Sequence, residues 1–549
     1  CDSAGNLLPQ SRKIRTSYQM RFSNIYSLFR SQTAKYGDTP VFFARNGNGW
    51  DSQTWAEFED KVQDLACAFL AKGLTKGASV AILAGNIPEW SICDIATIAA
   101  GGVGVGIYPT SSAEQCEYVI NHSDAEFVIV DTVTQLQKLN SVRSPKVKQI
   151  VCIEDRGFRD LLSFGRSRRA EFLPQIEAAA MQADPDDTAI MVYTSGTTGQ
   201  PKGAMLSHRY ILNSVESLRR SVPIFETDVA ISYLPGCHVA ERISGIYNRL
   251  YNGTPAYFID DLSKLYEYML DIKPTVFASL PRFFEKIHAK VVGEKGAENV
   301  TSQDLRDSFG GKVRLLTSGG APLPLEIADF FKRHDLPILQ AYGLTENICG
   351  AFNTVAEHKF GTVGKSMPMC EIKIARDGEI LIKSEMMFSG YYKEPEKTAE
   401  MFDADGWLKT GDLGELDEAG FLKITGRKKE IIVLSSGKNV APALVENYVK
   451  ESHLISHCFL YGDGHSYCVA LITLNSLEAK GLDEEQVRAA IDAIVEKANA
   501  RVSGPEKIKK FMILAEDFSA DHDEITPTMK LKRNVVAANY KEVLEKLYE

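Results

Sequence analysis

Long apolar runs are missing from this sequence of 549 residues. A helix that crosses a membrane needs about 20 consecutive apolar residues, and even the apolar segment 95–108 is shorter and contains four glycines. We interpret that segment as a buried helix that leads into a strand. We therefore expect a cytoplasmic protein without a spanning helix, and peripheral contact at the inner face of the membrane is left open.

Paired cysteine motifs are also missing. The ten cysteines are scattered from Cys1 to Cys468 without a C-x-x-C pair, so neither a zinc site nor a dense disulfide framework is indicated. A reducing compartment is the simplest location. Because the chain begins with Cys1 rather than Met, we expect it to be trimmed, processed or part of a longer protein.

An excess of positive charge is the third absence. The formal net charge is -10, which argues against nucleic-acid binding through overall charge. Two short basic runs occur at residues 166–169 and 507–510. Such runs are usually solvated, and we predict that both are exposed helix faces.

The pattern of short apolar runs predicts the fold class. Runs that are typical of strands alternate with helical patterns such as 55–71, and they lie at 79–83, 127–130, 149–153, 189–193, 275–278 and 313–318. This alternation predicts an α/β fold of parallel and mixed sheets wrapped by helices. Ligands in such folds gather in the loops at the carboxyl ends of the strands.

The length of the chain exceeds what one hydrophobic core usually supports. The composition changes after about residue 428, and we expect a large N-terminal domain over 1–428 that includes a β-barrel-like subdomain. A small, mobile α+β domain is expected over 429–549, with a hinge in the turn 426–429. The first twenty residues are polar and weakly patterned, and we predict a surface arm there.

One polar loop, "YTSGTTGQPKGAMLSH" at 193–208, follows a predicted strand directly. It is not a Walker loop, because Lys202 lies between Pro201 and Gly203. Glycines would still allow close backbone approach to phosphate, while hydroxyl groups and one ammonium group would bind it. The residues concerned are Thr194, Ser195, Gly196, Thr197, Thr198, Gly199, Lys202 and Gly203. A flexible surface loop is the less favoured alternative.

The loop resembles the signature loop of the adenylate-forming superfamily, which includes acyl-CoA synthetases, peptide-synthetase adenylation domains and beetle luciferases. Further blocks match in the superfamily's order and extend the resemblance over nearly the whole chain. They are "YLPGCHVAER" (233–242), "SGGAPL" (318–323), "QAYGLTE" (340–346), "WLKTGDLG" (407–414), "ITGRKKEIIVLSSGKNVAP" (424–442) and "TPTMKLKR" (526–533).

The resemblance implies a reaction in two steps and a role for each block. ATP and a carboxylate give an acyl-adenylate and pyrophosphate, and the thiol of CoA then displaces AMP. In the first step the loop 194–199 and Lys202 would hold the leaving phosphates, and Glu346 and Thr197 would hold Mg²⁺. Thr345 would lie near the α-phosphate, and Lys530 would be the catalytic lysine that contacts the reacting oxygens.

Other residues would bind the nucleoside and the thiol. Gly319, Gly320, Ala321, Tyr342 and Gly343 would lie against the adenine, whereas Asp412 would accept the ribose hydroxyls beside Arg427. The resemblance further implies that the small domain rotates at Lys429. Gly437 and Lys438 would then approach the pantetheine arm of CoA.

The blocks at 233–242, 279–290 and 426–442 resemble those of bacterial long-chain and bubblegum-type fatty acyl-CoA synthetases. His238 would line the acyl site and orient the carboxylate. Gly236 and Cys237 depart from the usual pattern, which puts the shape of the pocket in doubt. We expect Cys237, Gly320 and the segment 236–250 to form part of an apolar tunnel wall.

The expected function is therefore that of an ATP- and magnesium-dependent fatty acyl-CoA synthetase that acts on long-chain acids. The expected partners are fatty acid, ATP and CoA, without nucleic acid, and the protein would be a monomer or homodimer. Two alternatives stay open: an acyl-AMP ligase that loads a carrier protein, and a catalytically silent lipid-binding relative. The silent relative is disfavoured by the presence of Lys202, Glu346, Asp412, Arg427 and Lys530.

Overall fold

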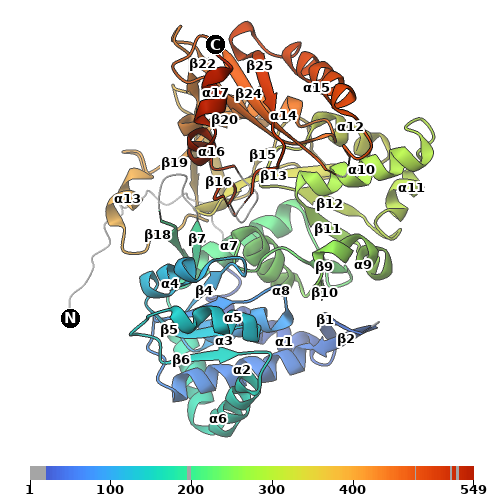
Figure 1. Cartoon of the computed structure of the whole chain (residues 1–549). Coiled ribbons are helices and arrows are strands. Elements are labelled where there is room, and N and C mark those ends of the chain that lie inside the picture. The colour runs from blue at the N-terminus through green and yellow to red at the C-terminus, as the bar shows by residue number, and fades with distance from the viewer. Residues whose placement is uncertain (1–19, 48, 195–199, 477, 520–521, 527–530) are drawn as a thin grey trace.

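The computed structural model describes residues 20–47, 49–194, 200–476, 478–519, 522–526 and 531–549. Figure 1 shows the first described elements, α1 (Ile25–Tyr36) and α2 (Trp55–Ala71), coloured blue, at one end of the molecule and the C-terminal region, coloured orange to red, at the opposite end. No helix in these ranges is long and apolar enough to cross a membrane. The predicted N-terminal surface arm lies outside the described residues.

A seven-stranded sheet in the order β18-β8-β7-β4-β3-β5-β6 forms one layer of the large region. The strands from β7 through β6 pair in parallel, and β8 and β18 extend the sheet with antiparallel pairing. The strands are β3 (Ser79–Leu83), β4 (Val103–Ile107), β5 (Ala125–Val130), β6 (Gln149–Cys152), β7 (Thr188–Thr194), β8 (Lys202–Ser207) and β18 (Gly390–Tyr391). The buried helix and strand predicted for 95–108 are confirmed, since α3 (Pro88–Ala99) precedes β4.

A nine-stranded sheet, β15-β14-β13-β12-β11-β9-β10-β1-β2, forms the second large layer. Its middle strands are parallel, and antiparallel strands close both edges. The strands are β1 (Pro40–Asn46), β2 (Gly49–Thr54), β9 (Ala230–Ser232), β10 (Ala256–Phe258), β11 (Val276–Ser279), β12 (Leu315–Ser318), β13 (Ile338–Leu344), β14 (Asn347–Phe352) and β15 (Lys365–Ser366). The predicted mixture of parallel and antiparallel strands wrapped by helices is confirmed.

Helices cover these sheets. The remaining helices of the large region are α1 (Ile25–Tyr36), α2 (Trp55–Ala71), α4 (Ala113–His122), α5 (Val133–Lys138), α6 (Arg156–Gln182), α7 (His208–Ser221), α8 (Asn248–Asn252), α9 (Leu265–Ile272), α10 (Pro281–Lys295), α11 (Ser302–Asp307), α12 (Leu325–Arg333) and α13 (Pro395–Glu400). Helix α2 begins with a capping box between Thr54 and Glu57, which satisfies the free N–H groups of its first turn.

The contact of α2 with α6 adds detail to one prediction. A Cβ atom at Gly165 would lie 1.8 Å from the carbonyl oxygen of Asp64, so only glycine allows the two helices to approach this closely. The basic run 166–169 lies on helix α6 and is mostly exposed, as predicted. Arg166 and Arg169 also bond to the buried Asp64 carboxylate, at 3.0 and 2.5 Å. The second basic run lies on a strand, β25 (Ile508–Ile513), rather than on a helix.

A four-stranded antiparallel sheet lies where we expected a β-barrel-like subdomain. Its order is β16-β17-β19-β20, and it contacts β14 and β15 of the nine-stranded sheet. The strands are β16 (Cys370–Ile374), β17 (Glu379–Ser384), β19 (Leu408–Leu416) and β20 (Leu422–Arg427). This sheet directly precedes the predicted hinge.

The C-terminal region is built on a three-stranded sheet, with separate apolar clusters packed around it. A short hairpin precedes this sheet. The elements are β21 (Ile432–Val433), β22 (Asn439–Val440), α14 (Pro442–Val449), β23 (Ile455–Tyr461), β24 (Cys468–Leu474), α15 (Glu484–Asn499), β25, α16 (Arg533–Asn539) and α17 (Lys541–Lys546). The predicted α+β character of this region is confirmed.

Candidate functional site

The phosphate-type loop connects two paired strands. Thr194 at the end of β7 lies opposite Lys202 at the start of β8, so these two residues are fixed in an antiparallel pair. The predicted phosphate ligands Ser195, Gly196, Thr197, Thr198 and Gly199 lie outside the described residues. Lys202 itself is half-buried, and its Nζ lies 4.6 Å from the centre of the Tyr391 ring.

Glu346 lies in the tight turn between β13 and β14, and its side chain is buried. The hydroxyl of Tyr391 donates a hydrogen bond to Oε1 of Glu346. The backbone N–H of Phe388 donates to the Glu346 carbonyl at 2.9 Å. Burial and the negative charge of Glu346 raise the pKa of Tyr391, so the tyrosine stays a protonated donor.

A second tyrosine, Tyr210, holds the same turn through its hydroxyl group. The Tyr210 hydroxyl, on α7, donates to the carbonyl of Thr345 and accepts from the N–H of Ile348, both at 3.0 Å. A Cβ atom at Gly343 would lie 1.9 Å from the Ile348 carbonyl oxygen, so the turn closes only around glycine. Thr345 and Glu346 are therefore presented by a rigid backbone.

The residues assigned to the ribose, Asp412 and Arg427, are bonded to each other; Asp412 is buried and Arg427 is exposed. Asp412 on β19 lies opposite Arg427 on β20. Its Oδ1 accepts from Arg427 Nε at 2.8 Å, and its Oδ2 accepts from the Tyr342 hydroxyl at 2.7 Å. Each carboxylate oxygen has two lone pairs, so Asp412 can accept one further hydrogen bond at each oxygen.

Three of the residues assigned to the adenine, Gly319, Gly320 and Ala321, follow strand β12, and Tyr342 and Gly343 lie on the neighbouring strand β13. Gly320 has a φ of 78°, a backbone conformation that favours glycine. A Cβ atom at Gly319 would lie 3.7 Å from Ala341, and Ala321 is exposed. Beside this loop, Ser318 Oγ and Gln340 Oε1 are buried without a hydrogen-bond partner among the described residues. Such buried polar atoms indicate a place for a polar ligand.

The block "YLPGCHVAER" is held mainly by buried charges. Arg242 is fully buried, donates to Asp94 Oδ2 from Nε at 3.1 Å and contacts the Met191 carbonyl at 3.4 Å. Tyr247 donates to the same Asp94 oxygen at 2.7 Å. The neighbouring Glu241 accepts from Arg249 at 2.7 Å. These groups satisfy one another, so their role in the structure is to fix the segment.

The two residues that depart from the usual pattern are packing residues here. A Cβ atom at Gly236 would lie 2.7 Å from the Trp90 ring, and one at Gly106 would lie 2.5 Å from Cys237. Cys237 is only 3% exposed. His238 is half-buried, and its Nδ1 accepts a hydrogen bond from the N–H of Ala240 at 3.2 Å.

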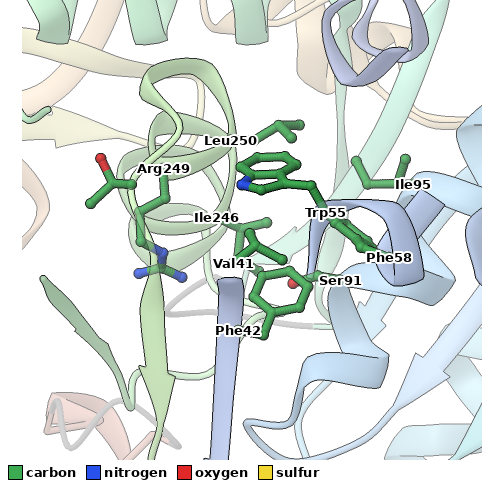
Figure 2. A pocket seen from close by; sticks show the side chains of 10 residues that line it. Val41, Phe42, Trp55, Phe58, Ser91, Ile95, Ile246, Arg249 and Leu250 are labelled. Carbon is green, nitrogen blue, oxygen red and sulfur yellow. The ribbon is translucent and has the colours of Figure 1, made fainter. Parts of the chain in front are cut away.

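A small cavity borders the helical turn that follows His238. It is lined chiefly by apolar side chains and has a volume of about 20 Å³, which is room for about one water molecule. Figure 2 shows the Trp55 ring between Leu250 and Ile246, with Phe58 and Ile95 beside it. This cavity is too small to hold a fatty acyl chain.

The residues assigned to domain movement and CoA lie around the start of the C-terminal region. Lys429 lies in a single helical turn, Lys428–Glu430, and is exposed. Gly437 has a φ of 76°, but a Cβ atom there would meet nothing within 4 Å. Its need for glycine in this arrangement is therefore conformational rather than steric. Lys438 is exposed, and Lys530 lies outside the described residues.

Helix α14 of the C-terminal region packs against β20, and polar contacts link the C-terminal region to α10 and α12 as well. Arg282 donates to the Ile455 carbonyl at 3.3 Å, and Lys497 lies 3.9 Å from Glu326. A cavity of about 290 Å³ separates the regions beside these contacts, lined by residues that include His288, His453 and Tyr448. Exposed ion pairs contribute little to stability, so these polar contacts do not oppose rotation strongly.

Sequence reasoning missed the tyrosines that support the site. It also missed Asp94, the buried partner of Arg242. No distinctive spacing marks the apolar or loop segments that contain Tyr210, Tyr391 and Asp94. Their partners come from segments 45 to 153 residues away, and no pattern within one segment could reveal such contacts.

Lys202, the turn of Glu346 and the loop of Gly319 and Gly320 lie at strand ends, as nucleotide sites do in α/β proteins. A family model described as "AMP-binding enzyme" matches residues 29–392, and one described as "AMP-binding enzyme C-terminal domain" matches 429–549. The chain therefore belongs to the AMP-binding enzyme family. This finding confirms the superfamily resemblance.

Among curated relatives, the long-chain-fatty-acid–CoA ligase FadD15 of Mycobacterium bovis is 34% identical over 91% of this chain and 92% of its own length. The long-chain-fatty-acid–CoA ligase ACSBG2 of Gallus gallus is 30% identical over 95% of this chain and 81% of its own. The resemblance to both the bacterial and the bubblegum-type enzymes is thereby confirmed.

Solved structures share the fold. ATP-bound MatB from Rhodopseudomonas palustris superposes with a TM-score of 0.77 at 23% identity, over 95% of this chain and 100% of that one. The adenylation domain of a carboxylate reductase from Mycobacterium chelonae gives 0.78 at 24% identity, over 96% and 91%. At this identity the likeness concerns the fold.

Proposed function

We propose that this chain is an ATP-dependent fatty acyl-CoA synthetase whose substrates are long-chain acids. The observation that carries the proposal is the set of contacts that link these groups: Tyr391 contacts both Lys202 and Glu346. Asp412 bonds to Arg427 and to Tyr342, which lies on the strand that leads to Glu346. The names of the relatives, all long-chain-fatty-acid–CoA ligases, support the same activity.

In the first step a carboxylate oxygen attacks the α-phosphorus of ATP, and pyrophosphate leaves. The barrier is largely electrostatic, because an anion approaches a polyanion. Lys202 and the loop 194–199 would hold the β- and γ-phosphates, and Thr345 would lie at the α-phosphate. Lys530 would approach the reacting oxygens from the C-terminal region.

Glu346 is suited to hold Mg²⁺ with the phosphates. Within the described ranges no group of three or more His, Cys, Asp or Glu side chains forms a metal site. Magnesium in nucleotide sites needs only one or two carboxylates together with phosphate oxygens and water, and the buried Glu346 fits that requirement. When bound, the ion would neutralise charge that develops on the leaving phosphates.

The nucleoside would be held by groups that already form a framework. Asp412 would accept the two ribose hydroxyls while keeping its bonds to Tyr342 and Arg427. The loop of Gly319, Gly320 and Ala321, with Gly343, would lie along the adenine. The orphaned Ser318 and Gln340 oxygens supply acceptors at this place.

In the second step the thiol of CoA attacks the acyl carbonyl and AMP leaves. Rotation at Lys429 would withdraw Lys530 and bring Gly437 and Lys438 to the thiol. The weak polar contacts between the regions support this movement. His238 and the segment 236–250 would border the acyl chain, with each buried methylene contributing about 0.8 kcal/mol.

Other expectations stay predictions: a monomer or homodimer, a cytoplasmic location and peripheral membrane contact. The experiment that tests the activity is carboxylate-dependent exchange of pyrophosphate into ATP, across acids of increasing length, followed by CoA consumption. We expect exchange and CoA consumption to rise together toward long chains. Exchange without CoA consumption would favour an acyl-AMP ligase, and absence of exchange with every acid would favour the silent relative.

A further inference from the structure

We propose that Tyr391 is a positioning residue that keeps Lys202 and Glu346 apart and ready for magnesium–ATP. This inference rests on the roles proposed above for those two residues. Tyr391 lies on β18, almost 200 residues after the phosphate loop in the chain, and is 5% exposed. None of the sequence blocks that carry the family resemblance includes Tyr391.

The side chain of Tyr391 contacts both charged residues with different parts of its ring. Its hydroxyl donates to Oε1 of Glu346, and its face lies 4.6 Å from the ammonium nitrogen of Lys202. Within the part of the chain that the structure describes, this is the one hydrogen bond to the Glu346 carboxylate. Oε2 of Glu346 is thereby left to face a cation.

The two contacts of Tyr391 also keep Lys202 and Glu346 from pairing directly with each other. A lysine and a glutamate at one site would pair directly, and each would then have to be released before it could bind phosphate or metal. Among the described residues no ion pair joins Lys202 to Glu346. The aromatic face satisfies the ammonium group weakly, so phosphate oxygens can displace it readily.

The backbone around Tyr391 fixes its position between the two residues. Tyr391 lies opposite Ala204 on β8, and the N–H of Tyr392 donates to the Gly203 carbonyl at 2.8 Å. The N–H of Tyr391 donates to Thr398 Oγ1 at 2.8 Å. Together with the bond from Phe388 to the Glu346 carbonyl, these bonds link the segment 388–392 to strand β8, which begins at Lys202, and to the turn that carries Glu346.

The neighbouring Tyr392 offers a matched control. Its hydroxyl donates to Asp124 at 2.9 Å and takes no part in the proposed site. The variants Tyr391→Phe and Tyr392→Phe each remove one hydroxyl and keep the ring. Tyr391→Leu removes the ring face as well, and Glu346→Gln tests the proposed metal ligand itself.

The test measures ATP binding to the full chain by calorimetry at increasing Mg²⁺ concentrations, with no fatty acid or CoA, so no turnover occurs. We expect Tyr391→Phe to raise the Mg²⁺ concentration for half-maximal binding about 10-fold, since a hydrogen bond to a charged group is lost. Tyr391→Leu should weaken ATP binding further, and the loss should shrink at high salt, because a direct Lys202–Glu346 pair would be screened. Tyr392→Phe should match the unchanged protein.

A normal Mg²⁺ dependence in Tyr391→Phe, with a shifted one in Glu346→Gln, would overturn the role of Tyr391 and leave the proposed site standing. No shift in Glu346→Gln would overturn the metal role of Glu346 and this inference with it. Thermal melts check folding, and if Tyr391→Leu does not fold, the isosteric Tyr391→Phe decides alone.

Discussion

Two clusters of charged residues within the large region are built in opposite ways. At Asp94 and Arg242 the charges meet directly, are fully buried and are completed by Tyr247. At Lys202 and Glu346 a tyrosine stands between the charges. The comparison teaches that a buried charge satisfied by its neighbours maintains the fold, whereas a charge held but not neutralised is available to a ligand.

The largest expected effect on stability comes from breaking the direct pair. Arg242→Met leaves Asp94 buried without its cation, and we expect the free energy of unfolding to fall by about 3–5 kcal/mol. Urea denaturation followed by fluorescence measures the change. A loss below about 1 kcal/mol would contradict the assignment of this pair to the fold.

The opposite result is expected at the separated pair. Lys202→Met should reduce fatty-acid-dependent pyrophosphate exchange about 100- to 1000-fold, because a preorganised cation is lost from the developing charge. Its free energy of unfolding should change by less than about 1 kcal/mol, since the cation–π contact is modest. Exchange assays and urea denaturation on the same preparation give both values. Normal exchange by a destabilised variant would reverse the comparison.

A buried histidine predicts that the protein loses stability in acid. His208, at the start of α7, accepts from the N–H of Ile25 at 3.3 Å, and burial lowers its pKa from 6.5 to about 4. The unfolded state therefore binds the proton first, and stability falls as the pH drops from about 6.5 to about 4. The contribution is at most about 3 kcal/mol.

Denaturation across this pH range compares the original protein with His208→Gln, which cannot titrate. We expect the variant to lose less stability over this interval than the original protein does. Parallel pH curves for the two proteins would show that His208 is not the sensitive group.

The smallest effect is expected at an exposed ion pair, which serves as a control for the buried one. Arg209 lies 2.5 Å from Asp186, and both side chains are more than one third exposed. Arg209→Met should change the free energy of unfolding by less than about 1 kcal/mol. A cost as large as that of Arg242→Met would mean that burial is not what distinguishes the two pairs.

The sequence predicted the sheets better than the contacts between them. The strand 79–83 and the helix 55–71 have their predicted bounds, because an alternation of apolar runs with amphipathic segments is a local property. The basic run at 166–169 lies on a mostly exposed helix face, as predicted. Its bonds to Asp64 were not predicted, because Asp64 lies about 100 residues earlier in the chain.

The residues of the candidate site also divide into those predicted from one contiguous segment and those that no single segment reveals. The loop at Lys202 and the turn at Glu346 were predicted from contiguous blocks. The side chain that joins them, Tyr391, comes from a third segment and has no local signal. The expectation that Cys237 and the segment 236–250 form part of an acyl tunnel wall stays a prediction; the close approach of Gly236 to Trp90 and of Cys237 to Gly106 could not be read from the sequence.

The most direct test of this account is pyrophosphate exchange into ATP by the full chain, with and without a long-chain fatty acid, beside the Lys202→Met variant. The account predicts exchange that requires the acid and is nearly abolished in the variant. Exchange that proceeds without acid, or that persists in the variant, would contradict it.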